Sequence, residues 1–323
     1  MDAKELQLYI IEQVDKLNWD IDPKNLYAPI KYVLSLGGKR IRPLSALLAC
    51  DLFSGDVQRA LKPALALEVF HNFTLLHDDI MDRAEVRRGQ PCVHVKWNDS
   101  AAILSGDAML IKSYQLLEQC DPAILPQLLP LFSRTAAEVC EGQQYDMDFE
   151  SRLDVSVAEY LEMIRLKTAV LLAAALKIGA ICGGASDLDA QYLYEFGINI
   201  GIAFQLKDDL LDVYGDKKDF GKEIGGDICC NKKTFLLINA IQKAEGDDKK
   251  ELNKWLSAKK FKKEEKVEAV KNIYDKLYLR SLTEQKMQEY YGYAIEALRR
   301  VNRSEEEKTK LYQLADKLLH RIS

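Results

Sequence analysis

Residues 75–82 read LLHDDIMD and close an apolar run that begins at Ala64. The run predicts a buried helix, and at helical spacing Asp78 and Asp82 lie on one face while Asp79 points about 100° away. Carboxylates one turn apart repel each other, and burying them costs on the order of several kcal/mol unless a cation is present. The stretch therefore predicts a core helix that ends in a cation-binding acidic cluster.

The same acidic spacing returns at Asp208, Asp209 and Asp212, after the apolar run 196–206. A single DDxxD motif is usually just a solvated helix end, but both copies here follow hydrophobic sequence, which favours two walls of one metal site. Hard oxygen ligands select Mg²⁺ or Ca²⁺, and Mg²⁺ typically takes one or two carboxylates plus substrate phosphates. Neither motif has the central Gly and closing Glu of an EF-hand loop, so Mg²⁺ is the expected ion.

Apolar residues recur with the period of a helix almost throughout, and the alternation typical of strands is scarce. We therefore predict an all-α fold, a large helical bundle in which residues 1–323 form a single domain. The stretches 155–182 and 187–213 are apolar nearly all round, as expected of central helices. Residues 243–276 are dense in mixed charge and are interpreted as a solvated face without a function. The predicted helices span residues 3–17, 24–36, 42–53, 57–81, 98–119, 127–150, 155–182, 187–213, 232–244, 249–258, 263–279, 282–300 and 304–320.

Composition excludes several classes of protein. A net charge of −5 argues against general nucleic-acid binding. Residues 1–16 form an acidic amphipathic pattern, so neither a secretory signal nor a transit peptide is expected. No run approaches the ~20 apolar residues of a membrane span. The 7 cysteines show no CxxC pair and no metal-ligand spacing, which predicts reduced, mostly buried thiols in a cytoplasmic protein.

Cationic side chains flank both sides of the first acidic cluster. Residues 37–43 read GGKRIRP, which is either a helix stop followed by a proline start or an anion site. In the second interpretation Lys39 and Arg42 point together beside helix N-terminal amides. Arg87 and Arg88 follow the cluster on a loop, where each could hold a separate phosphate group bidentately.

Two further segments carry lysine. Lys167-Thr168 interrupts an apolar helix, and a buried lysine there needs an anionic partner. Residues 221–234, GKEIGGDICCNKKT, are either an ordinary mobile loop or a glycine-rich ligand loop that brings Lys222 and Lys232 to an anion. Acidic clusters together with these basic segments indicate a polyanion receptor, for which diphosphate is the economical ligand.

An ExxH pattern at residues 68–71 is the one competing metal motif. Di-iron bundles need two such copies, and no other histidine has Glu three residues before it. That interpretation fails. His71 is therefore either a core histidine or part of a substrate pocket.

Taken together, these motifs resemble the trans-isoprenyl diphosphate synthases of the polyprenyl synthetase family, in particular the short-chain farnesyl and geranylgeranyl diphosphate synthase type. The resemblance runs from Gly37 to about Lys233 and rests on motifs that occur in the family's order. It implies an all-α bundle of the isoprenoid synthase type with a deep central cavity, a homodimer, and three Mg²⁺ ions. The motifs are GGKRIRP, LLHDDIMDRAEVRRGQP, SGD at 105–107, EGQQYD at 141–146, KT at 167–168, FQLKDDLLD and GKEIGGDICCNKKT.

The resemblance assigns roles to individual residues. The metal ligands would be Asp78 and Asp82 for two ions and Asp208 for the third, with Asp79, Asp209 and Asp212 in support. The allylic diphosphate would be held by Arg87, Lys167, Lys222 and Lys232, and isopentenyl diphosphate by Lys39, Arg42, His71 and Arg88. Thr168 and Gln205 would position the allylic group and stabilise its cation, so the catalytic set is Asp78, Asp82, Lys167, Thr168, Gln205 and Asp208. Two small departures, Cys92 where many relatives have Thr and Ala169 where Gly is common, remove no charged ligand.

Product length would be set on the helix before Asp78. Phe73 lies five residues upstream, about 7.5 Å along a helix at ~1.5 Å per residue. We expect Phe73, with the small Thr74 beside it, to form the floor that stops elongation, and Phe70 to be a core residue. In family terms this combination resembles enzymes that make C20 or C15 products.

Three rival functions remain. A terpene cyclase would share the first acidic motif but should carry an Asn/Asp-x-x-Ser/Thr-x-x-x-Glu pattern in place of the second. A non-catalytic regulatory subunit would be expected to have lost one aspartate cluster, and both are intact here. A structural helical protein would bind no diphosphate. Chain elongation by a Mg²⁺-dependent trans-prenyltransferase is the preferred interpretation.

Overall fold

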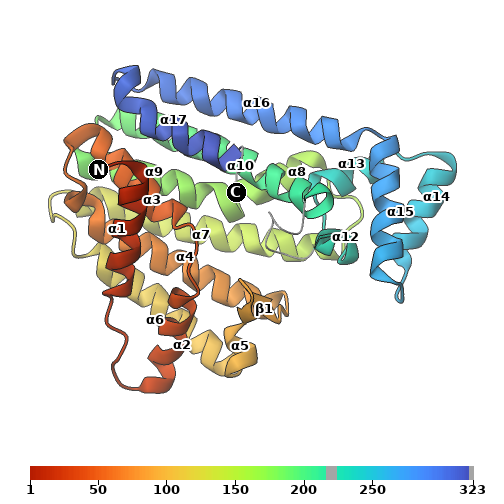
Figure 1. The fold of residues 1–323 in the computed structure, drawn as a ribbon, viewed down its shortest axis with the longest axis horizontal. Coiled ribbons are helices and arrows are strands. Elements are labelled where there is room, and N and C mark those ends of the chain that lie inside the picture. Colours follow the sequence, from red (N-terminus) through yellow and green to blue (C-terminus); the bar gives the residue numbers. More distant parts are fainter. Residues whose placement is uncertain (216–223, 320–323) are drawn as a thin grey trace. The chain divides into compact units, whose positions relative to one another are not determined.

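The computed structural model describes residues 1–215 and 224–319, and it confirms the all-α prediction (Figure 1). Contacts divide the chain into two compact units. Unit 1 comprises Met1–Ala136, Leu171–Gly197 and Ala297–Leu314. Unit 2 comprises Ala137–Val170, Ile198–Glu296 and the residues from Ala315 onward. A single domain over residues 1–323 with a central cavity stays a prediction.

Unit 1 is built around α4 (Leu61–Met81), which lies side by side with α6 (Asp99–Leu117) in Figure 1. Helix α4 is buried on nearly all sides, because it also packs against α2 (Lys24–Ser35) and α3 (Ile41–Ser54). Unit 1 further contains α1 (Ala3–Asp15), the 3-10 helix η1 (Val57–Ala60), α5 (Val93–Lys96), and α9 (Val170–Gly183) from Leu171 onward. It also takes the first parts of α7 (Leu125–Glu150) and α10 (Asp187–Tyr214), the end of α16 (Leu279–Arg300) and most of α17 (Glu305–Leu319).

Unit 2 holds the second acidic motif near the end of α10. Its first hydrophobic cluster packs Tyr160 and Ile164 of α8 (Val157–Ile164) against Phe235 of α13 (Phe235–Lys243). Its second cluster joins α13 to a helical hairpin of α14 (Gly246–Ser257) and α15 (Lys263–Lys276), which Figure 1 shows side by side. A π-helix, η2 (Arg165–Ala169), and the short helix α12 (Gly226–Cys229) complete the elements that carry predicted site residues.

The predicted helices match the structure to within a few residues, but four short elements were missed. Strands β1 (Val86–Arg87) and β2 (Gln90–Pro91) form an antiparallel hairpin. Its two-residue turn has positive φ at both Arg88 (54°) and Gly89 (74°), as a type I′ turn requires. Two-residue strands and four-residue helices such as α5 and α12 are too short for a periodic pattern to reveal.

The residues 157–183 correct the expectation that no segment approaches membrane-spanning length. This helical segment of 27 residues has an 18-residue window with mean hydropathy 1.7, long and apolar enough to cross a bilayer by composition alone. However, 78% of that window is buried inside the protein, as expected of a core helix.

All 7 cysteines are free, as predicted. Most are shielded, but Cys140 and Cys230 are exposed and Cys229 is half-buried.

Candidate active site

The first acidic motif lies at the carboxyl end of α4. The Asp82 N–H donates to the Asp78 carbonyl at 2.8 Å, which places these two residues one helical turn apart as predicted. Met81 is the last helical residue and Asp82 caps the helix. The negative end of the helix dipole adds to the charge of the carboxylates. This helix end therefore attracts cations.

Arg87 on the β1–β2 hairpin supplies one such cation. Its Nε lies 2.8 and 2.9 Å from the two carboxylate oxygens of Asp79, and a terminal nitrogen lies 2.7 Å from the same group. The other contact of the guanidinium is to Asp78 at 3.4 Å. Asp79 is only 4% exposed. The fork-like pairing therefore fixes the middle carboxylate of the motif, an interaction that the sequence did not reveal.

Cys92 also contacts this carboxylate. Burial, together with the charge of Asp79 and a hydrogen bond to it, raises the pKa of the Cys92 thiol to about 12. The protonated thiol can therefore donate to Asp79, as a threonine hydroxyl would. Cys92, where many relatives have threonine, therefore still provides a hydrogen-bond donor to Asp79.

The predicted isopentenyl diphosphate residues gather in unit 1 beside α3 and α4. An Arg42 guanidinium nitrogen lies 3.0 Å from Nε2 of His71. Arginine has only donors, so Nε2 must accept and the ring is neutral, with its proton on Nδ1. Arg88 donates to the Gly37 carbonyl, and its guanidinium covers Gly38, where a Cβ would lie 2.8 Å from Arg88 Nη2. Gly38 has φ +132°, so both backbone and space require glycine.

This group of side chains has a surplus of positive charge. Burial, then Arg42 and Arg88, lowers the pKa of His71 well below its ordinary value. Burial and the Arg88 charge also lower the pKa of Arg42 to about 10, although Glu68 opposes the shift. Buried guanidinium groups that lie close together repel each other, and a bound anion offsets this repulsion. The geometry supports an anion site at Arg42, His71 and Arg88.

Arg40 and Lys39, the two remaining cations of the GGKRIRP segment, differ sharply. Arg40 is buried, pairs with Glu68 and donates to the Leu34 carbonyl at 2.6 Å. Glu68 also accepts from Asn72 at 2.8 Å, so the ExxH glutamate is a structural partner of arginine, in agreement with the rejected di-iron motif. Lys39 is exposed, and its carbonyl accepts from Gln7 at 2.7 Å.

Phe73 is 8% exposed and lies between two other rings. Its ring centroid is 5.5 Å from that of Phe70 and 4.8 Å from that of His77. Phe70 is 1% exposed and packs on Phe132 at 5.4 Å, so it is a core residue as expected. The neighbouring Thr74 hydroxyl donates to the His71 carbonyl at 2.8 Å, which leaves its methyl group to face the surroundings.

The second acidic motif lies within the last two turns of α10. Asp209 is 3% exposed and accepts hydrogen bonds from the Tyr160 hydroxyl and from Gln205 Nε2, the latter at 3.0 Å. Burial and the nearby charge of Asp227 raise the pKa of Asp209 to about 7. Asp212 is 7% exposed and accepts from the Asp227 N–H at 3.1 Å.

Thr168 and Gln205, which the resemblance assigns to the allylic group, are directly hydrogen-bonded to each other, a contact that was not predicted. The Thr168 hydroxyl donates to Gln205 Oε1 at 3.2 Å, and Gln205 Nε2 continues to Asp209. This orders the amide, because the oxygen accepts and the nitrogen donates. The chain of bonds joins η2 to α10 inside unit 2.

Lys167 of η2 forms an ion pair with Asp146 of α7. Its Nζ lies 2.7 Å from Asp146 Oδ2, and Lys232 Nζ lies 3.7 Å from the same oxygen. Burial acts to raise the pKa of Asp146, but Lys232 and Lys167 outweigh it and the pKa is lowered. Two predicted allylic diphosphate residues are therefore brought together. Lys222 lies outside the described residues.

A π-bulge presents Lys167 and Thr168. Residues Arg165–Ala169 adopt the wider π-helix, which often marks functional positions in helices. Gly142 makes room for it, since a Cβ there would lie 2.2 Å from the Lys167 backbone nitrogen. The glycine of the EGQQYD motif thus has a packing role.

Both acidic motifs suit Mg²⁺. All six candidate ligands are carboxylates, the oxygen donors that this ion prefers. The raised pKa of Asp209 reflects burial first and then the charge of Asp227, and a bound cation would offset both effects. Across residues 1–215 and 224–319, no group of three or more His, Cys, Asp or Glu side chains forms a metal site by itself.

Sequence reasoning missed four residues that organise the site. They are Asp146, Tyr160, Asp227 and Glu68. Only Asp146 left a signal, because a buried Lys167 demands an anionic partner. The other three meet their partners through tertiary contacts that no local pattern encodes.

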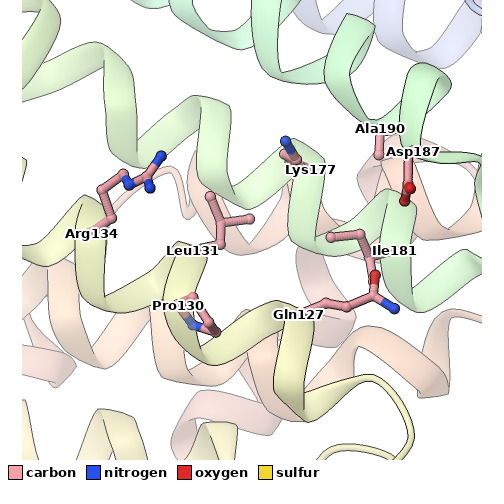
Figure 2. A pocket seen from close by; sticks show the side chains of 8 residues that line it. All are labelled: Gln127, Pro130, Leu131, Arg134, Lys177, Ile181, Asp187 and Ala190. Atoms are coloured by element: carbon pink, nitrogen blue, oxygen red, sulfur yellow. The ribbon is translucent and has the colours of Figure 1, made fainter.

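A separate cavity of about 280 Å³ lies in unit 1 between α7, α9 and α10 (Figure 2). None of the predicted site residues lines it. Figure 2 shows Arg134 and Lys177 at this cavity, and Lys177 donates to Gln191 at 2.8 Å.

Comparison with known proteins places these motifs in a family. The sequence matches the polyprenyl synthetase family model over residues 23–274. It is 43% identical over 244 residues to a geranylgeranyl diphosphate synthase of Methanosarcina mazei, covering 75% of each chain. A crystal structure of a geranylgeranyl pyrophosphate synthase superposes with a TM-score of 0.95 at 43% identity, over 100% of both chains. The geranylgeranyl pyrophosphate synthase of Corynebacterium glutamicum, solved with isoprenyl diphosphate and magnesium, gives a TM-score of 0.85 at 27% identity, over 99% of this chain and 97% of that one. The chain belongs to the polyprenyl synthetase family.

Proposed function

We propose that this chain is a Mg²⁺-dependent trans-prenyltransferase that condenses isopentenyl diphosphate with an allylic diphosphate. Its product is a short-chain all-trans prenyl diphosphate, of which the C20 geranylgeranyl compound is the first choice. The observation that supports the proposal is that two groups of side chains would bind anions in different ways. Acidic motifs with Lys167 and Lys232 suit a metal-bound diphosphate, whereas Arg42, His71 and Arg88 suit a second diphosphate held without metal.

The reaction needs a leaving group and a shielded cation. The allylic carbon–oxygen bond breaks, and the diphosphate leaves with the electron pair. The double bond of isopentenyl diphosphate then forms the new carbon–carbon bond, and the proton lost from the adjacent carbon passes to the departing diphosphate. Bound Mg²⁺, three ions by family resemblance, supplies Lewis acidity to the allylic diphosphate.

The side chains bind and orient the two substrates. Lys167 and Lys232, with Arg87 and Lys222, bind the allylic diphosphate and oppose the charge that develops on it. Thr168 and Gln205 place their dipoles beside the allylic cation, and their mutual hydrogen bond keeps them oriented. Lys39 joins Arg42, His71 and Arg88 around isopentenyl diphosphate. Apolar residues exclude water from the cation.

The floor of the product site is Phe73 with Thr74. Phe73 is held between Phe70 and His77, so its ring is a rigid stop. Phe73→Ala is expected to lengthen the product by one or more C5 units, measured by chromatography of the dephosphorylated alcohols. Phe196→Leu, a change at a fully buried phenylalanine of α10, is the core control and should leave product length unchanged. An unaltered product from Phe73→Ala would place the floor elsewhere.

We also propose a cytoplasmic homodimer that associates through α6. The side chains of Ile103, Leu104 and Ile111 are 47%, 59% and 60% exposed, an apolar surface that a monomer would leave in water. Leu104→Glu with Ile111→Glu should shift the mass measured by sedimentation equilibrium from dimer to monomer. A wild-type chain that sediments as a monomer would contradict this proposal.

The nearest alternative is a terpene cyclase on the same fold. Asp208 and Asp212 stand where a cyclase would carry its Asn/Asp-x-x-Ser/Thr-x-x-x-Glu pattern, and the Arg42–His71–Arg88 site would have no substrate in a cyclase. Both features favour elongation. A regulatory subunit remains the non-catalytic alternative.

One experiment separates these functions. The purified protein is incubated with Mg²⁺, isopentenyl diphosphate and dimethylallyl, geranyl or farnesyl diphosphate in turn, and the products are sized. The proposal predicts prenyl diphosphates that stop at C20. Cyclised hydrocarbons formed without consumption of isopentenyl diphosphate would indicate a cyclase. Absence of turnover with all three starters, together with binding of all the ligands, would indicate a regulatory subunit.

A further inference from the structure

Lys266 is the exception in the charged segment 243–276. Most lysines of this segment are exposed, but Lys266 is 1% exposed, and a fully buried lysine is rare unless it has a partner. Burial lowers its pKa. The interpretation of the whole segment as a solvated face is therefore wrong at this residue, and its contacts indicate a role.

The Lys266 ammonium of α15 contacts the last residue of α12 and a residue just beyond that helix. Its Nζ donates to the Cys229 carbonyl at 3.2 Å and to Asn231 Oδ1 at 2.7 Å. It also lies 4.3 Å from the centroid of the Phe261 ring, within cation–π range. These contacts compensate a charge that would otherwise be costly to bury.

The α14–α15 hairpin also holds α12 at two other points. Asn231 Nδ2 donates to the Leu256 carbonyl of α14 at 3.0 Å. Val267, the residue after Lys266, covers Gly225 so closely that a Cβ on Gly225 would lie 2.5 Å from it. Gly225 has φ +78° and Asn231 has φ 54°, so both ends of α12 have left-handed backbone that these contacts fix.

On its other side α12 is tied to the diphosphate residues. The Gly225 N–H donates to the Asp212 carbonyl at 2.7 Å, and the Lys232 N–H donates to the Asp227 carbonyl at 2.9 Å. Lys232 immediately follows Asn231, and its ammonium lies 3.7 Å from Asp146. A shift of Asn231 therefore moves Lys232.

We propose that Lys266 is a positioning residue for the allylic diphosphate site, acting through Asn231 and the Cys229 carbonyl to set the place of Lys232. This inference rests on the proposed function of the same site. It assigns a role to the charged hairpin, because α14 and α15 contact the residues from Gly225 to Asn231 that precede Lys232. Lys266 itself touches no substrate.

The test replaces Lys266 by an apolar side chain of similar length. Lys266→Met should raise the KM for the allylic diphosphate about tenfold or more, since small misplacements of a binding group are costly. The KM for isopentenyl diphosphate should change less than twofold, because its residues lie in unit 1. Asn231→Gly tolerates the left-handed backbone but removes the side-chain oxygen that accepts the hydrogen bond from Lys266. It should give the same selective rise, and the double variant should show little further change.

Lys308 offers a matched control in unit 1. It is also 1% exposed, and its Nζ donates to the carbonyls of Arg299 at 3.1 Å and Val301 at 3.3 Å. Lys308 also pairs with Glu305 at 2.7 Å, so Lys308→Met should lower the melting temperature at least as much as Lys266→Met, without a selective change in the allylic KM. An equal effect of both variants on both substrates would reduce Lys266 to a structural residue and overturn the proposal.

A binding measurement separates this inference from the proposed function. Inorganic diphosphate with Mg²⁺ is titrated calorimetrically into the wild type, Lys266→Met, Asn231→Gly and Lys308→Met. Weakened binding in the first two variants alone supports the inference even if the wild type forms no prenyl product. Equal binding by all four proteins overturns it, as does a wild type that binds no diphosphate. If Lys266→Met fails to fold, Asn231→Gly decides.

Discussion

The two DDxxD motifs have the same spacing but opposite electrostatic surroundings. In the first, Asp79 is held by the charged fork of Arg87. In the second, Asp209 is held by the neutral donors Tyr160 and Gln205, and its pKa rises to about 7. The negative charge of the motif at the end of α4 is thus partly compensated by Arg87. The negative charge of the motif on α10 is less compensated, so that motif should favour a bound cation more strongly.

The spacing of a DDxxD motif therefore identifies its candidate metal ligands, but it does not determine how far their negative charge is compensated by neighbouring side chains. This compensation is set by elements outside the motif, the β1–β2 hairpin in one case and α8 in the other. In unit 1 the surplus is positive, around Arg42 and Arg88, whereas in unit 2 Asp227 adds negative charge beside Asp209. Such a division suits a reaction in which one diphosphate is bound through metal and the other through arginine.

Removal of one ligand from each motif should give the largest effect. Asp78→Asn and Asp208→Asn each delete a negative charge from the proposed metal ligands with little change in shape. Each should lower kcat/KM on the order of 10²–10³-fold, because charge stabilisation of the leaving group depends on them. Steady-state assays at saturating Mg²⁺ measure the loss. Near-normal turnover by either variant would remove that motif from the metal site.

The supporting residues should differ in their contribution to stability. Arg87→Met leaves Asp79 buried without its charged partner, which should cost about 3 kcal/mol of the free energy of unfolding. Tyr160→Phe removes one neutral donor from Asp209 and should cost about 1–2 kcal/mol. Urea unfolding of metal-free protein measures both. The comparison fails if Tyr160→Phe proves the more destabilising change.

The smallest expected effect is on the pH dependence of the free energy of unfolding, through His71 and the arginines beside it. The pKa of folded His71 is below that of an unfolded histidine, ~6.5, because of burial and the arginines. Below that pH the unfolded chain binds a proton that the folded chain does not, so stability falls as pH drops. Above it this contribution is constant. His71→Gln, which keeps an acceptor for Arg42, should flatten the slope between pH 7 and pH 5. An identical slope in both proteins would contradict a neutral His71.

Much of the fold was predictable because long apolar helices leave a periodic signal. The one-turn spacing of Asp78 and Asp82 also agrees with expectation, whereas the roles given to the two aspartate motifs stay predictions. The sequence could not reveal that Arg87 is already paired with Asp79, since the hairpin that aims it has strands of two residues. Nor could it reveal Tyr160 or Lys266, whose partners lie 49 and 35 residues away along the chain. Their roles depend on packing between elements, which local pattern does not encode.

The central claim is that both acidic motifs are needed to bind Mg²⁺ together with diphosphate, and one calorimetric comparison tests it. Mg²⁺ is titrated into the protein with and without inorganic diphosphate. Because Mg²⁺ takes few carboxylates and completes its coordination with phosphate oxygens, the account predicts weak binding alone and tight binding with diphosphate. The tight phase should disappear in both Asp78→Asn and Asp208→Asn. Diphosphate-independent Mg²⁺ binding, or a tight phase that survives both substitutions, would contradict the account.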